Sequence, residues 1–381
     1  MRRTLAALGA LVIAAAVLAS AQARNDADPL PRRGWFGVAL APHEAGALVT
    51  SVVPGSSAAT HGVTAGDVIR AVDEAAMRSP EQVIAAVSRH SVADVVVIDL
   101  ERKGQPLRLS VRIGELPRET LPGTTFEYGS VTLMDGSRLR TILSKPERRD
   151  GPRPAVMLIP GGGCGSIDTP LAPDIAQPGL MRTIAARGYV TMRVEKSGVG
   201  DSRGPSCETI GYRQELDGYR AALAALTRHP DVDSSQVYLL GISLGGVFAP
   251  VLARETRIRG IAVFGTLASA PGKYPGRSDR FFEEFSTVDI PAAWSDVDAR
   301  VLVLHGQFDE TTAEADHARI AALVNARHPG RASHQELAGL DHCWTRHATE
   351  SSSKGNCGKG QEVSTLADAL LAFFGGAGVR S

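Results

Sequence analysis

A serine between a strand-like run and a helix-like run is the residue best placed for nucleophilic chemistry in this sequence. Residues 241–245 (GISLG) follow the apolar run 237–240 (VYLL) and precede a helix-like stretch at 247–255. A sharp turn at this point strains the backbone at Ser243, and the flanking glycines leave room for the turn and for close packing of strand and helix. The hydroxyl of Ser243 is therefore expected to stand above the edge of a sheet.

A carboxylate and a histidine follow two later strand-like runs. Residues 300–304 (RVLVL) are typical of a buried parallel strand and lead to Asp309, while His342 lies between a short strand at 335–337 and a helix at 363–374. The ends of parallel strands are where catalytic groups collect in open α/β sheets. Taken singly, Asp309 is also compatible with a turn or cap residue and His342 with an ordinary loop histidine. Glu310 is the weaker candidate for the acid.

A glycine run follows the apolar strand-like segment 155–159 (AVMLI). Residues 160–166 read PGGGCGS, and glycines allow a backbone to approach a substrate carbonyl closely. The alternative is a phosphate cradle or a flexible turn, but no G-K-[ST] follows, which argues against a nucleotide site. We therefore interpret the N–H of Gly162 as a donor to a substrate oxygen, with Gly163 next in line.

Together these motifs resemble the α/β-hydrolase superfamily, in its dienelactone-hydrolase and esterase-like branches, over residues 125–376. The resemblance implies a mostly parallel sheet with helices on both faces. In this superfamily the acid and the histidine follow the serine in that order, which implies a triad of Ser243, Asp309 and His342. It also implies an oxyanion hole made by the N–H groups of Gly162 and Leu244. Relatives often carry Asp-x-Arg-Gly where this chain has 195–198 (EKSG), a departure expected to change only a structural loop.

The segment 267–295 is the expected cap over this site. It contains five aromatic residues, which we expect partly to line an acyl pocket and partly to pack the cap: Tyr274, Phe281, Phe282, Phe285 and Trp294. Three further histidines are expected to be solvated, namely His317, His328 and His334, whereas His305 is expected to be structural.

Residues 34–116 form a different, β-rich unit. Short strand-like runs alternate with turns and one helix, and the stretches PGSSA (54–58) and GVTAGDVI (62–69) resemble a PDZ domain of the bacterial periplasmic kind. The resemblance implies capture of an extended peptide by strand addition, with Trp35, Phe36, Gly37 and Val38 as the carboxylate loop. Alternatively, Trp35 and Phe36 are core or interdomain contacts and the groove takes no external peptide. Residues 117–124 are the expected linker.

The N-terminus and the charge balance bear on compartment and partners. Residues 1–23 have an Arg2-Arg3 start, an apolar run at 5–18 and a small-x-small site at 21–23 (AQA), which is the pattern of a secretory signal peptide. The run is shorter than the roughly 20 residues of a membrane span. An exported protein, periplasmic or secreted, is expected. The chain has 41 acidic and 41 basic residues, which argues against nucleic-acid binding.

Four cysteines in an exported protein suggest two disulfides, for which three pairings exist. Neighbouring loops at one sheet edge favour Cys164–Cys207 and Cys343–Cys357. The rival is a zinc site of His342, His347, Cys343 and Cys357, but these spacings fit no standard zinc pattern. Neither a metal nor an organic cofactor is expected.

These observations favour an exported serine hydrolase that cleaves small-molecule esters through an acyl-enzyme. Two alternatives remain open at this point. One is a serine peptidase acting on peptides, including protein C-termini, presented by the PDZ-like domain. The other is a non-enzymatic peptide-binding protein on a hydrolase scaffold.

Overall fold

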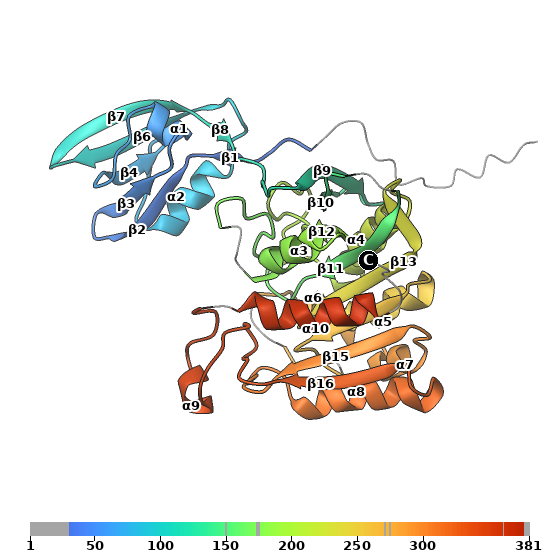
Figure 1. The fold of residues 1–381 in the computed structure, drawn as a ribbon. Coiled ribbons are helices and arrows are strands. Elements are labelled where there is room, and N and C mark those ends of the chain that lie inside the picture. The colour runs from blue at the N-terminus through green and yellow to red at the C-terminus, as the bar shows by residue number, and fades with distance from the viewer. Residues whose placement is uncertain are drawn as a thin grey trace, which may run out of the picture.

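The computed structural model describes residues 30–148, 151–172, 176–269, 272–273, 276–360 and 362–376. The predicted signal peptide lies outside the described residues. The chain forms a small β-rich unit followed by a larger α/β unit, seen at the upper left and at the centre of Figure 1.

The small unit is an antiparallel sheet with strand order β2-β3-β4-β6-β7, in which β5 pairs with β4, and β1 pairs separately with β8. Alternate residues of β6, including Val96, Ile98 and Leu100, are buried against the core. Helix α2 begins where the Ser79 side chain accepts from the Gln82 N–H, a standard N-cap. The elements are β1 (Gly34–Trp35), β2 (Val38–His43), β3 (Gly46–Val52), α1 (Ser57–Thr60), β4 (Val68–Val72), β5 (Ala75–Ala76), α2 (Pro80–Val87), β6 (Val95–Arg102), β7 (Gln105–Arg112) and β8 (Gly114–Glu115).

The larger unit is built on an eight-stranded sheet of order β9-β10-β12-β11-β13-β14-β15-β16. The pairs β9–β10 and β10–β12 are antiparallel and all the others are parallel. Its elements are β9 (Thr124–Thr132), β10 (Arg138–Pro146), β11 (Arg153–Ile159), α3 (Ala176–Ala186), β12 (Val190–Val194), α4 (Tyr212–Thr227), β13 (Val232–Ile242), α5 (Gly245–Glu255), β14 (Gly260–Phe264), α6 (Asp279–Ser286), α7 (Ile290–Ser295), β15 (Arg300–Gly306), α8 (Glu314–Arg327), β16 (Ala332–Leu337), α9 (Glu350–Ser353) and α10 (Val363–Gly375). The predicted mostly parallel sheet is confirmed.

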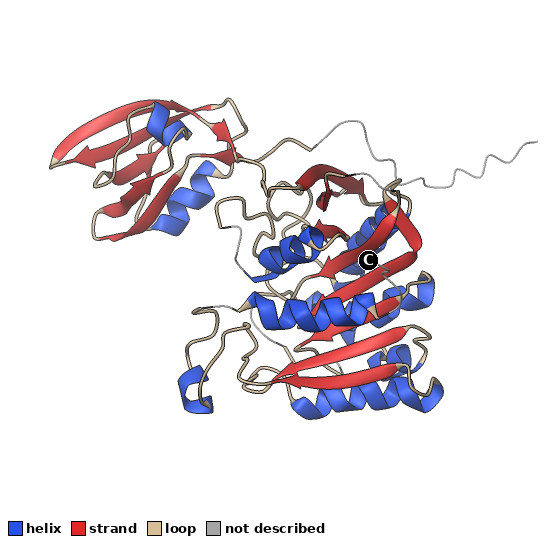
Figure 2. Ribbon diagram, viewed as in Figure 1, coloured by secondary structure: helices blue, strands red, loops and turns tan. Residues whose placement is uncertain are grey.

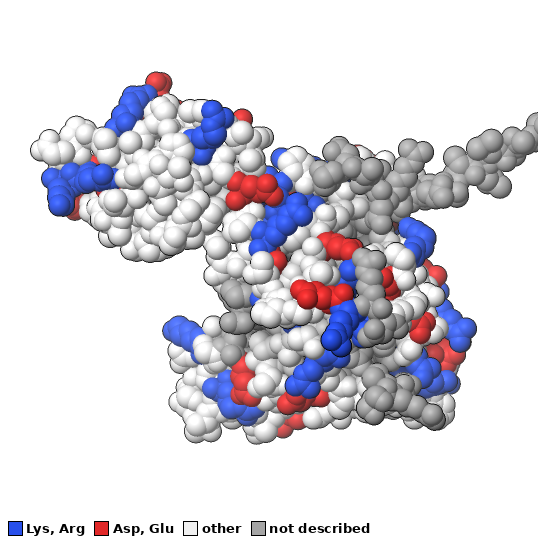
Figure 3. All heavy atoms as spheres, turned by 45° about the horizontal axis from the view of Figure 1, so that its top comes forward, with Lys and Arg blue, Asp and Glu red and all other residues white. Residues whose placement is uncertain are grey.

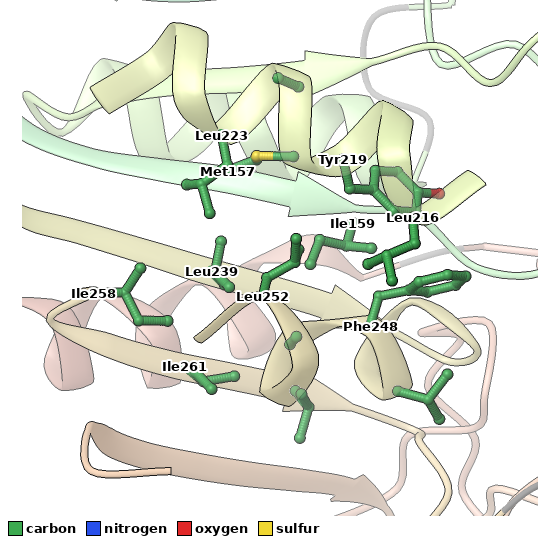
Figure 4. Close-up of a cluster of buried hydrophobic side chains, with 14 of the residues drawn as sticks. Met157, Ile159, Leu216, Tyr219, Leu223, Leu239, Phe248, Leu252, Ile258 and Ile261 are labelled. Atoms are coloured by element: carbon green, nitrogen blue, oxygen red, sulfur yellow. The ribbon is translucent and has the colours of Figure 1, made fainter. Parts of the chain in front are cut away.

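Helices cover both faces of this sheet (Figures 1 and 2). On β11, Met157 and Ile159 pack with α4 and α5 on one face, whereas Val156 and Leu158 pack with α3 and α10 on the other. Figure 4 shows the first of these clusters, with side chains of β11 and β13 meeting those of α4 and α5. A strand buried on both faces has no polar side, which is why its sequence is a continuous apolar run.

The segments flanking the small unit are anchored in the larger one. Arg32 is 4% exposed, and its Nη1 lies 2.5 Å from an oxygen of Asp168 and 2.5 Å from an oxygen of Asp201. In the predicted linker, Glu119 is 3% exposed and pairs with Arg193 at 2.8 Å and Arg182 at 3.2 Å. Within the predicted linker, Glu119 is therefore anchored in the larger unit, whereas most of its neighbours in 117–124 are exposed.

Glu119→Ala is expected to destabilise the larger unit by about 3–5 kcal/mol, because it leaves the buried Arg193 guanidinium without its carboxylate. Glu115→Ala, at an exposed position nearby, is the matched control and should change stability by less than about 0.5 kcal/mol. Urea unfolding of the full chain, followed by the fluorescence of the buried Trp294 and Trp344, measures both. Equal unfolding midpoints for the two variants would contradict a structural role for Glu119.

The surface carries both signs of charge. On the face shown in Figure 3, Lys and Arg are interspersed with Asp and Glu, and much of the small unit is uncharged. None of the helices in the described part of the chain has the length and hydrophobicity needed to cross a lipid bilayer.

Candidate active site

Ser243 occupies a strained turn between β13 and α5. Its φ is +52°, a left-handed conformation that non-glycine residues rarely adopt. The turn is possible because its neighbours lack side chains: a Cβ on Gly245 would lie 2.0 Å from the carbonyl oxygen of Ile159, and one on Gly241 would lie 2.6 Å from the Cα of Gly246. The glycines of the motif therefore bring the serine turn directly against the end of β11.

Asp309 and His342 are hydrogen-bonded to each other. The distance from His342 Nδ1 to Asp309 Oδ2 is 2.8 Å, and the side chains are 17% and 0% exposed, respectively. Asp309 Oδ1 also accepts the N–H groups of Thr311 (2.8 Å) and Thr312 (2.9 Å), and Oδ2 accepts the Thr312 hydroxyl (2.8 Å). Because the carboxylate is the acceptor at Nδ1, the neutral imidazole carries its proton there and leaves Nε2 free to accept one.

These contacts keep Asp309 ionised. Burial raises the pKa of its carboxyl group, but the hydrogen bond and charge of His342 and the donors of Thr312 outweigh burial, and the pKa lies below its usual value. Glu310, the weaker candidate for the acid, is exposed. The geometry thus favours Asp309 over its neighbour.

Gly265, at the end of β14, lies between the serine turn and the acid–histidine pair. The Ser243 N–H donates to the carbonyl of Phe264 at 2.9 Å. A Cβ on the adjacent Gly265 would lie 2.9 Å from His342 Nδ1 and 3.0 Å from Asp309 Oδ2. Any side chain at 265 would displace the pair, so this glycine is a site residue that the sequence analysis missed; its only signal was its place at the end of a buried strand.

The structure forms only one of the two hydrogen bonds that a triad needs. Among the described residues, Ser243 Oγ and His342 Nε2 do not form a hydrogen bond with each other. Such bonds are often long in enzymes without substrate and tighten when it binds. The three predicted residues thus lie at one end of the sheet. His342 is bonded to Asp309 but not to Ser243.

A cavity of about 490 Å³ contains the serine. It is lined by Ser243 and by both predicted oxyanion donors, Gly162 and Leu244, together with Gly163, Cys164, Glu208, Leu267, Gly276, Thr311 and Thr312. The glycine loop, residues 160–166, runs past Ser243, since a Cβ on Gly161 would lie 3.4 Å from the Cβ of Ser243. A cavity of about 730 Å³ lies among Ser234, Arg254 and Arg300, at the opposite strand ends, and contains none of these groups.

Two disulfides hold the loops of the site. Cys164 in the glycine loop is joined to Cys207, and Cys343, next to His342, is joined to Cys357, with Cα–Cα distances of 5.7 and 5.2 Å. These are the two predicted pairs. The alternative zinc site is not assembled, because its thiols are in disulfides and His347 pairs with Asp341 at 2.9 Å.

The aromatic residues of the predicted cap pack into the core. Helices α6 and α7 occupy this segment, and Phe281, Phe285 and Trp294 are at most 1% exposed. Phe285 stacks on Tyr212 of α4, with ring centroids 5.0 Å apart. Among the described residues of the segment, Leu267 and Gly276 line the serine cavity, so the expectation that aromatics line an acyl pocket is not supported there. Tyr274 lies outside the described residues.

A buried histidine supports the acid's loop. His317 of α8 is 0% exposed, contrary to the expectation of a solvated residue. Its Nδ1–H donates to the Ala313 carbonyl at 2.8 Å and its Nε2 accepts the Thr266 N–H at 3.0 Å. Burial lowers the pKa of His317 to about 4, and the hydrogen bond to Ala313 opposes only part of this effect. Through these two hydrogen bonds the neutral ring connects Thr266, the residue after Gly265, to Ala313 at the start of α8.

His317 is expected to make folding stability depend on pH. Its pKa is 6.5 in its unperturbed state and about 4 when folded, so between these values the unfolded chain binds more protons and stability falls as the pH falls. Over the whole range from pH 6.5 to about 4, the free energy of unfolding should fall by about 3 kcal/mol because of His317. In His317→Gln the decline between pH 7 and 4 should be smaller by about that amount than in the parent or in His328→Gln. Urea midpoints measured across this range provide the test; parallel pH curves would contradict it.

The predicted carboxylate loop lies beside an apolar cavity. Phe36 is 4% exposed and belongs to the small unit's core, while Gly37 has a φ of +86° and sits tightly against Ser56. A cavity of about 390 Å³ is lined by residues 33–38, by Leu40 of β2, by Val83, Ile84, Val87 and Ser88 in and after α2, by Leu116, and by residues 168–172 of the larger unit. The loop thus borders a groove between β2 and α2, and residues 168–172 of the larger unit form part of the groove wall. Phe36 is a core residue, as one alternative expected, and capture of a peptide stays a prediction.

Comparison with known proteins identifies each unit separately. The family model described as "PDZ domain" matches residues 34–113. The larger unit resembles solved structures along most of their length: DcsB in complex with its substrate analogue (TM-score 0.52, 16% identity, 66% of this chain and 99% of that chain) and the α/β hydrolase GrgF from Penicillium sp. sh18 (TM-score 0.50, 14% identity, 67% and 98%). The chain joins a PDZ domain to an α/β-hydrolase fold. At these identities the structural matches establish the fold alone.

One sequence relative is similar over a shorter stretch. Esterase EstD from Thermotoga maritima is 26% identical over 113 residues, which are 30% of this chain and 27% of the esterase. The match thus spans about a quarter of that protein.

Proposed function

We propose that the α/β-hydrolase domain is a serine hydrolase that cleaves carboxylic esters through an acyl-enzyme, with Ser243, His342 and Asp309 as its triad. The observation that carries this proposal is the Asp309–His342 hydrogen bond at the end of the sheet where Ser243 stands on a strained turn in the same cavity as the glycine loop. The resemblance to an esterase supports the choice of bond.

In this mechanism His342 Nε2 takes the proton of Ser243 as Oγ attacks the ester carbonyl carbon. Asp309 holds the Nδ1–H and stabilises the imidazolium. The oxyanion accepts the N–H groups of Gly162 and Leu244, each worth about 3 kcal/mol, and the N–H of Gly163 is the next donor in line. His342 then protonates the departing alcohol, and water, deprotonated by the same nitrogen, releases the acid and restores the serine.

The proposal is tested by labelling the purified protein with a fluorophosphonate, followed by a panel of p-nitrophenyl esters and matched peptide amides. Labelling with ester turnover supports it. Turnover of the peptides in preference to the esters would instead support a serine peptidase, and the absence of labelling and of turnover would refute both.

We further propose that the protein is exported after cleavage of residues 1–23 and that the PDZ groove takes a peptide with a free C-terminus. The small apolar groove beside Trp35 and Val38 supports the second point, because strand addition needs such a groove next to a carboxylate loop. N-terminal sequencing of protein recovered outside the cytoplasm should begin at Arg24. Binding of C-terminal peptides that is lost on C-terminal amidation would support the groove assignment.

A further inference from the structure

Two buried cations lie against the carbonyl side of the glycine loop. Lys196, which follows β12, donates from Nζ to the carbonyl oxygens of Gly161 (2.6 Å) and Gly163 (2.9 Å). Arg277, which precedes α6, donates from Nη1 to the carbonyl oxygen of Gly162 at 3.2 Å. Three successive carbonyl groups of the loop therefore each accept a hydrogen bond from a buried positive charge.

Glu215 of α4 binds both cations. One of its oxygens lies 3.3 Å from Lys196 Nζ and also accepts the Tyr219 hydroxyl at 2.8 Å, and the other is paired with Arg277. The three hydrogens of the Lys196 ammonium group thus have three acceptors. Burial lowers the pKa of Lys196, an effect that the charge of Glu215 opposes. Burial raises the pKa of Glu215, but Lys196 and Arg277 outweigh it and keep the carboxyl ionised. Lys196 and Arg277 thus share one carboxylate on the carbonyl side of the loop.

The hydrogen bonds to the carbonyl groups decide where the N–H groups of the loop point. In a trans peptide the C=O of one residue and the N–H of the next point in opposite directions, and the described residues contain no cis peptide bond. Because the Gly161 carbonyl faces Lys196, the N–H of Gly162 faces away from it. In the same way Arg277 turns the N–H of Gly163 away from itself. Both glycines line the cavity that contains Ser243.

Glycine peptides need such restraint more than others do. With no Cβ, each can rotate into several backbone conformations, and an N–H that must first be oriented stabilises a transition state less than one already in place. Residues 195–198, which the sequence leads us to expect as a structural loop, touch the glycine loop directly through Lys196.

We propose that Lys196, assisted by Arg277 and Glu215, is a positioning residue that aims the N–H groups of Gly162 and Gly163 at the oxyanion. This inference rests on the proposed ester hydrolysis. It predicts an effect on the transition state rather than on substrate binding, which a merely structural role would not produce.

The test is Lys196→Met, which keeps the length of the side chain and removes its charge and donors. With p-nitrophenyl valerate, kcat should fall on the order of 100-fold, the effect of losing one oxyanion donor, while KM changes less than about threefold. The Ki of butylboronic acid, whose tetrahedral serine adduct carries the same alkyl chain, should rise by a factor similar to the loss in kcat/KM.

Lys145→Met is the matched control. Lys145 is 6% exposed, close to the 5% of Lys196, and it too pairs with two carboxylates, Glu127 and Asp231, but on the antiparallel side of the sheet. Its kcat and boronate Ki should stay within about threefold of the parent. Equal losses in the two lysine variants, or a loss confined to KM, would overturn the inference.

Arg277→Met is the second variant, useful also if Lys196→Met does not fold. It removes the contact with the Gly162 carbonyl but leaves both carbonyl contacts of Lys196, so kcat should fall about tenfold at unchanged KM. An unchanged kcat in this variant would overturn the inference as well. Failure of the parent protein to hydrolyse esters would refute the proposed function itself, whereas an active parent with a fully active Lys196→Met would refute only the positioning role.

Discussion

Ser243→Ala is expected to abolish ester hydrolysis and fluorophosphonate labelling while leaving the fold intact. Loss of the nucleophile in a serine triad costs on the order of 10⁶ in kcat. Alanine keeps the Cβ, so the strained turn at φ +52° and the hydrogen bond from the residue 243 N–H to Phe264 are unchanged. Labelling gels, ester kinetics and circular dichroism of parent and variant measure the three expectations.

The control for this variant is Ser286→Ala, at an exposed position of α6 outside the serine cavity. It should retain labelling and turnover within about twofold of the parent. Turnover by Ser243→Ala at a rate close to that of the parent would refute the covalent mechanism, whatever the behaviour of the control.

The parts of the site that the sequence predicted correctly are set by local patterns. The apolar runs before Ser243, Asp309 and the glycine loop are strands buried on both faces, and their continuity is visible in the sequence. Parallel strands place their carboxyl ends at one edge, so residues just after such runs meet there. The serine turn needs glycines at fixed positions, which is again a short-range pattern.

The parts that the sequence did not predict depend on contacts between distant residues. Arg32 meets Asp168 and Asp201 across separations of 136 and 169 residues, and Glu119 meets Arg193 across 74. Nothing in a polar, proline-containing segment such as 117–124 distinguishes a free tether from a chain whose one carboxylate is buried between two arginines. Lys196 and Arg277 escaped notice for the same reason, since neither has a local partner.

His317 and the aromatic residues of α6 and α7 show a second limit to predicting the structure from the sequence. His317 lies on a weakly amphipathic helix, where a polar ring is expected to face water, but its two ring nitrogens find backbone partners at Ala313 and Thr266. The aromatic residues of α6 and α7 are equally ambiguous in sequence, because an acyl pocket and a packed core need the same side chains. The stacking of Phe248 and Phe285 on Tyr212 shows that the aromatic side chains here belong to a packed core and not to an acyl pocket.

Asp309→Asn is expected to lower kcat by about 10⁴, whereas Glu310→Gln should leave it within about threefold of the parent. The side chain of Asp309 is fully buried and bonded to His342, while Glu310 is exposed. Steady-state kinetics on one p-nitrophenyl ester compares the two variants, with the midpoint of urea unfolding as the check that each is folded. A larger loss in Glu310→Gln than in Asp309→Asn would identify Glu310 as the acid of the triad.

The geometry around Asp309 explains why the amide should be so damaging. Oδ1 accepts two backbone N–H groups, from Thr311 and Thr312, so an asparagine would keep its carbonyl oxygen on that side. Its NH₂ group would then face His342 Nδ1, at the position of the present 2.8 Å hydrogen bond. A donor there favours the tautomer with its proton on Nε2, which has no lone pair to accept the serine proton. The loss should therefore appear in kcat with KM nearly unchanged, and because hydroxide can replace the missing base, activity of the variant should recover in part as the pH rises.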